Sequence, residues 1–160
     1  MTRNQILLGL ILSAFALIII IPVVVIGGFV AYSIYRDEVA RPIAKQKVPE
    51  VKSEFRQIPA LAGAITTTND GFTFDPQHLT EGRLYRTNLP YSQIRAHYDA
   101  ELAKLGWKLD GESDVNGIDG KSHGGKEVLY SKGEFRARLY HKGTETQYGY
   151  NYYFCVTWCY

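Results

Sequence analysis

The first pattern along the chain is an apolar run that begins at Ile6 and ends at Val30. Within these 25 residues, Ser13 is the only residue that is not apolar, Gly or Pro. At about 1.5 Å per residue the run reaches roughly 37 Å, which exceeds the hydrocarbon core of a bilayer, about 30 Å thick. The pattern therefore predicts a tail at residues 1–5 and a transmembrane anchor at residues 6–35.

A cleaved signal peptide is the alternative to this anchor. Ala31 and Ser33 are small residues with the mutual spacing of a cleavage site. The hydrophobic region of a signal peptide usually runs for only about 7–15 residues, however, so the length of the run favours an anchor that is retained.

Charged residues and two prolines, Pro42 and Pro49, follow the anchor over residues 36–58. No sustained apolar period is evident there. We therefore expect a solvated juxtamembrane stalk, partly helical, that leads to a globular domain at residues 59–160.

Short β-rich segments open this domain. Residues 65–68 and 72–74 flank the turn tripeptide Asn69-Asp70-Gly71, which predicts a hairpin. Residues 83–87 predict a further strand.

An amphipathic helix is expected directly after Pro90, a residue tolerated where a helix begins. Beyond it, Gly106 suits the left-handed position that ends a helix, and Trp107 would fold back onto Leu102 as in a Schellman motif. The apolar positions of this helix recur at spacings of three and four residues: Tyr91, Ile94, Tyr98, Leu102 and Leu105.

The C-terminal third predicts strands after a Gly- and Asp-rich loop at residues 110–125. Residues 128–130 lead to a turn at Lys132-Gly133, and apolar residues alternate with Arg136 and Arg138 on the return segment. The last segment carries a bulky row on one side, which is expected to face the helix: Tyr148, Tyr150, Tyr152, Phe154, Val156, Trp158 and Tyr160.

The predicted fold class is thus α+β, with an N-terminal transmembrane helix followed by a small antiparallel sheet that packs on one amphipathic helix. Tyr98, Leu102, Trp107 and Trp158 are its expected core anchors. The opposite side of the last strand is predicted to be an interaction face formed by Tyr153, Cys155, Thr157 and Cys159.

Charge and cysteine content exclude several classes of protein. Beyond the apolar run the chain has 17 basic and 16 acidic residues, so it lacks the one-signed field that nucleic acid binding requires. Two cysteines are too few for a disulfide scaffold. Cys155 and Cys159, about 13 Å apart along one strand, should not bridge each other.

Three candidate chemical sites are weak. His97 and Glu101 lie one helical turn apart but lack a third metal ligand. Residues 112–118 resemble the start of a calcium loop, although His123 stands where the bidentate Glu belongs. Ser131, His141 and Asp119 are the residue types of a catalytic triad, but no nucleophile elbow surrounds Ser131. We therefore predict no catalytic residue, no metal site and no cofactor.

Four segments together resemble small α+β domains of bacterial lipoproteins and single-pass membrane proteins. They are residues Leu89 to Ile94, the helix ending Leu105-Gly106-Trp107, the turn at residues 129–133 and the aromatic last strand. The resemblance covers about residues 58–160. It implies an extracytoplasmic domain and supplies no catalytic residues.

Charge counting gives the opposite orientation, because basic residues flanking an anchor favour the cytoplasmic side. We follow the resemblance and expect a domain outside the cytoplasm. Arg3 precedes the anchor, whereas five basic residues follow it: Arg36, Arg41, Lys45, Lys47 and Lys52.

The expected function is that of a non-enzymatic interaction module, anchored in the cell membrane by a single pass and binding a protein or envelope component. An accessory subunit of a larger membrane complex, whose anchor helix packs on neighbouring helices through Gly27, Gly28 and a kink at Pro22, is the first alternative. A thiol-active enzyme that uses Cys155 or Cys159 is the second.

Overall fold

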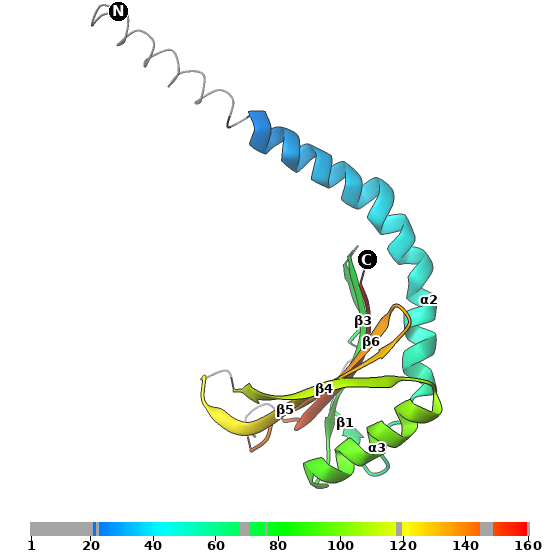
Figure 1. Cartoon of the computed structure of the whole chain (residues 1–160), viewed down its shortest axis with the longest axis vertical. Helices are drawn as coiled ribbons and strands as arrows, with labels where there is room; N and C mark the ends of the chain where they lie inside the picture. Colours follow the sequence, from blue (N-terminus) through cyan, green and yellow to red (C-terminus); the bar gives the residue numbers. More distant parts are fainter. Residues whose placement is uncertain are drawn as a thin grey trace, which may run out of the picture. The chain divides into compact units, whose positions relative to one another are not determined.

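The computed structural model divides the chain into two compact units, Met1–Ala40 and Arg41–Tyr160 (Figure 1). In the first unit the described residues before Tyr35 are α-helical, and a π-helix, η1 (Tyr35–Ala40), follows them. The structure describes residues 21, 23–67, 71–75, 77–117, 120–144 and 149–159. Within those ranges no helix has both the length and the apolar character needed to cross a membrane. The predicted tail and residues 6–20 of the predicted anchor lie outside them.

Among its described residues, the second unit has two α-helices and a seven-stranded antiparallel sheet, which confirms the predicted α+β class. Its elements are α2 (Arg41–Gln57), β1 (Ile65–Thr66), β2 (Thr73–Asp75), β3 (His78–Arg86), α3 (Tyr91–Lys104), β4 (Lys108–Asn116), β5 (Ser122–Lys132), β6 (Phe135–His141) and β7 (Tyr152–Cys159). The strand order is β1-β3-β7-β6-β5-β4, and β2 also pairs with β3.

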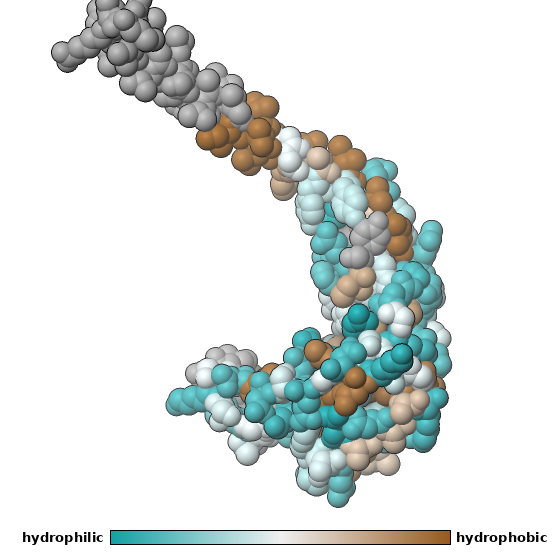
Figure 2. Space-filling model, in the orientation of Figure 1, coloured by the Kyte–Doolittle hydropathy of each residue, from teal (hydrophilic) through white to brown (hydrophobic). Residues whose placement is uncertain are grey.

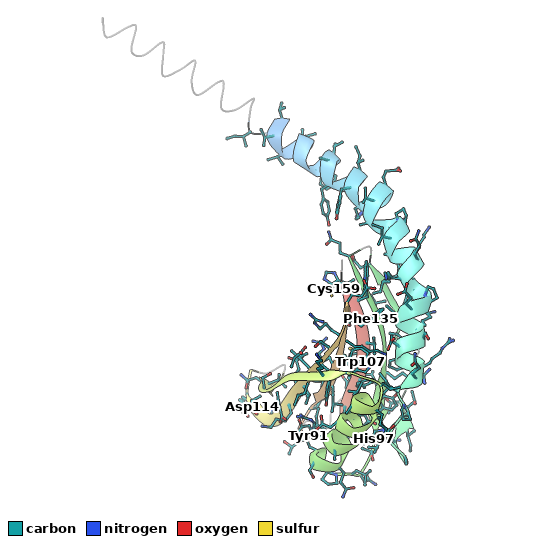
Figure 3. All side chains as sticks on the ribbon, turned by 45° about the vertical axis from the view of Figure 1, so that its right-hand side comes forward. Tyr91, His97, Trp107, Asp114, Phe135 and Cys159 are labelled. Atoms are coloured by element: carbon teal, nitrogen blue, oxygen red, sulfur yellow. The ribbon has the colours of Figure 1, made fainter. Side chains whose placement is uncertain are left out.

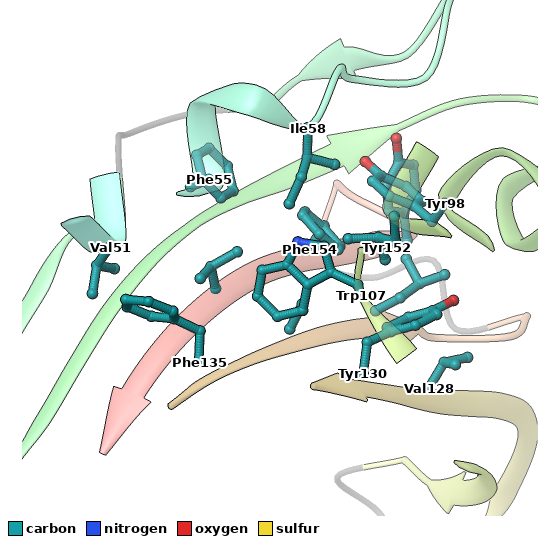
Figure 4. Packing of buried hydrophobic residues seen from close by; sticks show 14 of the residues in the cluster. Val51, Phe55, Ile58, Tyr98, Trp107, Val128, Tyr130, Phe135, Tyr152 and Phe154 are labelled. Carbon is teal, nitrogen blue, oxygen red and sulfur yellow. The ribbon is translucent and has the colours of Figure 1, made fainter. Parts of the chain in front are cut away.

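One face of this sheet and both helices bury a single hydrophobic cluster, part of which is drawn in Figure 4. The ring of Tyr98 on α3 stacks on Phe154 of β7 at a centroid distance of 4.3 Å. The predicted bulky row is confirmed for the four members that lie in β7: Tyr152, Phe154, Val156 and Trp158. Tyr150 precedes the strand, and Tyr148 and Tyr160 lie outside the described residues.

Helix α3 ends as the sequence predicts. The amide of Trp107 donates to the carbonyl of Leu102 (3.0 Å), and the amide of Gly106 donates to the carbonyl of Ala103 (3.1 Å). Gly106 has φ of 82°, so the two bonds form a Schellman motif. Tyr98, Leu102, Trp107 and Trp158, the expected core anchors, are all buried.

The stalk prediction is wrong for residues 41–57, which form a helix of the globular unit. Ala44, Val51 and Phe55 of α2 belong to the hydrophobic cluster. Ion pairs join the same helix to the turn between β5 and β6: Lys132 binds Glu54 (2.8 Å), and Lys47 binds Glu134. The helix tolerates Pro49 because packing offsets the backbone hydrogen bond that a proline removes.

The hairpin predicted around residues 69–71 is also wrong. Strands β1 and β2 do not pair with each other; both pair with β3, where Ile65 faces Arg86 and Phe74 faces Leu79. The amide of Gly71 donates to the carbonyl of Gly82 (3.1 Å), so Gly71 also lies alongside β3. Since β3 begins at His78, the reversal of the chain lies between β2 and β3.

The loop predicted at residues 110–125 is largely a hairpin of β4 and β5. Residues 112–116 are part of β4, where successive side chains point to opposite faces and do not surround a cation. Lys126 of β5 forms an ion pair with Asp114, whose position Figure 3 shows. All side chains of this edge strand are exposed or half-buried, so it lacks the apolar alternation that would have indicated a strand.

Candidate functional site

The outer face of the sheet, meaning the face opposite the hydrophobic cluster, carries the predicted interaction residues of β7. Tyr153, Cys155, Thr157 and Cys159 alternate with the buried row and therefore point to this face. Their accessibility differs. Tyr153 and Thr157 are half-buried and Cys159 is exposed, whereas Cys155 is only 1% exposed. Cys155 is thus not a contact residue, which corrects that part of the predicted face.

Cys155 is buried because the side chains of Tyr153 and Arg138 both reach its thiol. It pairs with Gly82 of β3 on one side and with Arg138 of β6 on the other. A methyl group at Gly82 would overlap the phenol oxygen of Tyr153 and would lie 2.7 Å from the Cβ of Cys155. The Tyr153 side chain therefore lies across the glycine, a close approach that only a residue without Cβ allows.

Tyr153 also forms part of a hollow on the outer face with a volume of about 370 Å³. This size falls within the range of about 300–1,000 Å³ that is usual for small-ligand sites. Direct strand partners bring its residues together: Tyr153 pairs with Tyr140 and Leu84, and Glu127 pairs with Tyr140. The outer-face pocket is lined by Leu84, Glu127, Arg138, Tyr140, Tyr150 and Tyr153.

Two charged residues of the pocket neutralise each other. The guanidinium of Arg138 donates to a carboxylate oxygen of Glu127 over 3.1 Å. The ammonium of Lys142 lies 4.0 Å from the centre of the Tyr150 ring, a cation–π contact at the border of the pocket. Burial raises the pKa of the Tyr153 phenol, so this wall of the pocket is uncharged at neutral pH.

The sequence pattern predicts one pocket residue, Tyr153, as an interaction residue. The same pattern places Tyr150 in the inward row, although the strand begins only at Tyr152. A usable signal was present on β6: Arg138 and Tyr140 alternate with the inward Ala137 and Leu139, which places both on the outer face.

A second hollow, of about 450 Å³, is lined entirely by residues of α2, among them Lys52 and Arg56. A single helix supplies every lining residue, so this hollow is a surface groove. Side chains from different elements do not converge on it. The outer-face pocket is therefore the stronger candidate for a binding site.

The weak chemical candidates have structural roles. The ring nitrogen Nε2 of His97 on α3 (Figure 3) is 2.9 Å from the carbonyl oxygen of Pro59, and Glu101 is bound by Lys104 (2.6 Å). No group of three or more His, Cys, Asp or Glu side chains suited to a metal occurs among the residues that the structure describes.

The triad residue types do not assemble either. The hydroxyl of Ser131 donates to Asp110 over 2.6 Å. Its position on β5 points to the outer face, because it pairs with Arg136, whereas His141 aligns with Tyr152 of the buried row. Asp119 lies outside the described residues.

No protein-family model, no curated protein and no solved structure matches this chain.

Proposed function

We propose that the protein is a single-pass membrane-anchored, non-enzymatic interaction module whose globular unit binds a partner through the outer face. The apolar run of residues 6–30 supports the anchor. The side chains of Val23, Val25 and Phe29 in the described part of this run are exposed, and Figure 2 draws apolar surface there in brown.

The observation that carries the proposal is the outer-face pocket. Both helices of the globular unit bury their apolar residues in the cluster on the other face. Among the described residues of the outer face, Leu129 is 41% exposed, and Arg136 and Arg138 are also exposed. Aromatic and arginine side chains at an open surface are the residue types that dominate protein binding sites.

The alternative of a thiol-active enzyme is less well supported than an interaction module. Reactive cysteines need an accessible thiolate in an electropositive setting. Cys155 is buried behind Tyr153, and Cys159 stands at the end of β7. An accessory subunit that packs through its anchor helix stays a second proposal. It relies on Gly27 and Gly28, beside which a methyl group would meet nothing within 4 Å.

We propose an extracytoplasmic location for the globular unit. The resemblance to lipoprotein domains supports this location, and the five basic residues after the anchor oppose it. The partner is a protein or another component of the envelope.

Site-specific photo-crosslinking in native membranes tests the proposed function. Benzoylphenylalanine at Leu129 places the probe on the outer face beside the pocket, and the same group at Gln93 of α3 is the matched control. We expect an adduct from position 129 that is absent from position 93. Equal adducts from both positions, or an adduct from position 93 alone, would contradict an outer-face interaction.

A further inference from the structure

The outer-face pocket combines three phenol rings in one small volume. Tyr140 and Tyr153 are direct partners on β6 and β7, and Tyr150 joins them from the segment before β7. Each ring has an apolar face and a polar oxygen, so it can pack on a ligand that is itself apolar in one direction and polar in another. A pyranose ring is such a ligand, because its C–H groups and its hydroxyl groups point in different directions.

The ion pair in the pocket supplies the matching polar groups. Arg138 is a planar donor with five N–H groups, one of its nitrogens being engaged by Glu127 at 3.1 Å. The carboxylate of Glu127 accepts hydrogen bonds. Side by side, the two groups present donors and acceptors at the spacing of one hydrogen-bonded pair, which suits two adjacent hydroxyl groups of a sugar.

The charge balance of the pocket selects against ionic ligands. One positive and one negative side chain line it and are bonded to each other, and the ammonium of Lys142 at its border lies over the Tyr150 ring. An anion would have to compete with Glu127 for Arg138, and a cation would have to compete with Arg138 for Glu127. A neutral ligand leaves the ion pair in place.

We propose that the outer-face pocket binds one or two rings of a neutral saccharide, with the sugar faces on the tyrosines and adjacent hydroxyl groups on Arg138 and Glu127. This inference rests on the proposed interaction function and names its ligand class. A pocket of about 370 Å³ that is open to solvent fits a short stretch of a longer glycan whose remaining rings stay outside.

Saturation-transfer NMR on the full-length chain in nanodiscs tests the proposal, with di-N-acetylchitobiose and cellobiose as neutral probes and glucuronic acid as the anionic comparison. We expect saturable binding of a neutral probe in the millimolar range and a preference over glucuronic acid. Arg138→Ala and Tyr150→Ala should each weaken it by about tenfold or more, the value of one good polar or stacking contact.

Arg136→Ala is the matched control, because Arg136 lies on the same strand and face but outside the pocket. Circular dichroism establishes that each variant is folded. The saccharide proposal fails if no neutral probe binds, if glucuronic acid binds more tightly, or if Arg136→Ala weakens binding as much as Arg138→Ala.

The photo-crosslinking result separates this failure from failure of the proposed function. An adduct confined to position 129 together with absent sugar binding overturns the saccharide and retains the interaction face. Equal adducts at positions 129 and 93 overturn the interaction face itself.

Discussion

Gly82 on β3 lies so close to Tyr153 on β7 that the phenol oxygen of Tyr153 occupies the space where a β-carbon of residue 82 would stand. The two residues are diagonal neighbours, since Gly82 pairs with Cys155 and Leu84 pairs with Tyr153. This relationship sets the position of one aromatic wall of the pocket and also shields the thiol beneath it.

The first prediction concerns this close approach. Gly82→Ala should lower the free energy of unfolding by about 1–3 kcal/mol, because the added methyl group overpacks the site. It should also displace Tyr153 and make Cys155 more reactive. Urea unfolding and thiol labelling measure the two effects. Gly111→Ala in β4 is the control: a methyl group there meets nothing within 4 Å, so its unfolding free energy should stay the same or rise slightly.

The second prediction concerns the end of α3. Trp107 is 4% exposed, and Trp107→Ala should cost about 3–5 kcal/mol of unfolding free energy. Among the described residues its indole Nε1 has no hydrogen-bond partner, so Trp107→Phe keeps much of the packing and removes an unsatisfied donor. We expect Trp107→Phe to cost clearly less. Chemical unfolding followed by circular dichroism compares them, and a Trp107→Ala variant as stable as the parent would contradict the packing of α3 on the sheet.

The third prediction tests whether α2 belongs to the globular unit. Phe55 stacks on Phe154 with ring centres 6.0 Å apart, and Arg83 lies over the Phe55 ring. Phe55→Ala should therefore lower the unfolding free energy by about 3–5 kcal/mol. Ser53→Ala, at an exposed position of the same helix, should change it by no more than about 0.5 kcal/mol. Equal stability of both variants would restore the interpretation of residues 41–57 as a stalk.

The elements that could be predicted from the sequence are those in which apolar residues recur at a regular spacing and a short motif marks the end. Helix α3 has an apolar stripe and a Gly-Trp C-terminus, β6 alternates between buried and exposed or half-buried positions, and β7 does the same except at the buried Cys155. Local hydrogen bonding and burial of one face dictate such elements, so few distant contacts are needed to recognise them.

Other elements depend on contacts that the local pattern does not contain. The buried positions of α2, Ala44, Val51 and Phe55, are spaced by seven and four residues, a helical stripe that Pro49 and many charges conceal. Among the described strands, β4 pairs only with β5, and its polar residues suit either an edge strand or a loop. The pocket was missed for the same reason: four strands and a loop supply its residues, and only the strand register brings them together.

The fourth prediction is a pH dependence from His141. Its Nδ1 accepts a hydrogen bond from the amide of Gly143 (3.1 Å), and burial lowers its pKa from the ordinary value of 6.5. Between the ordinary pKa and the lower pKa of the folded chain, the unfolded chain binds more protons. The unfolding free energy should therefore fall as the pH drops below about 6.5 and level off below the folded pKa.

His141→Asn keeps an acceptor near the Nδ1 position and removes the titrating ring. Its unfolding free energy should vary less with pH between 7.5 and 5 than that of the parent chain, as measured by urea titrations at several pH values. Identical pH profiles for the two proteins would rule out His141 as the source.

The fifth prediction uses the different burial of the two cysteines. Both are free in the structure; Cys159 is exposed near the end of β7 (Figure 3), and Cys155 is buried. The chain contains two cysteines in all, so Cys159 should be the single fast-reacting thiol of the folded protein and Cys155 should react only on unfolding. Cys159→Ser should abolish the fast phase, and Cys155→Ser should retain it.

A membrane-impermeant maleimide applied to intact cells then also tests the proposed location: labelling of the Cys155→Ser protein before lysis requires an extracytoplasmic globular unit. Labelling only after lysis would instead place that unit in the cytoplasm, as the basic residues after the anchor indicate.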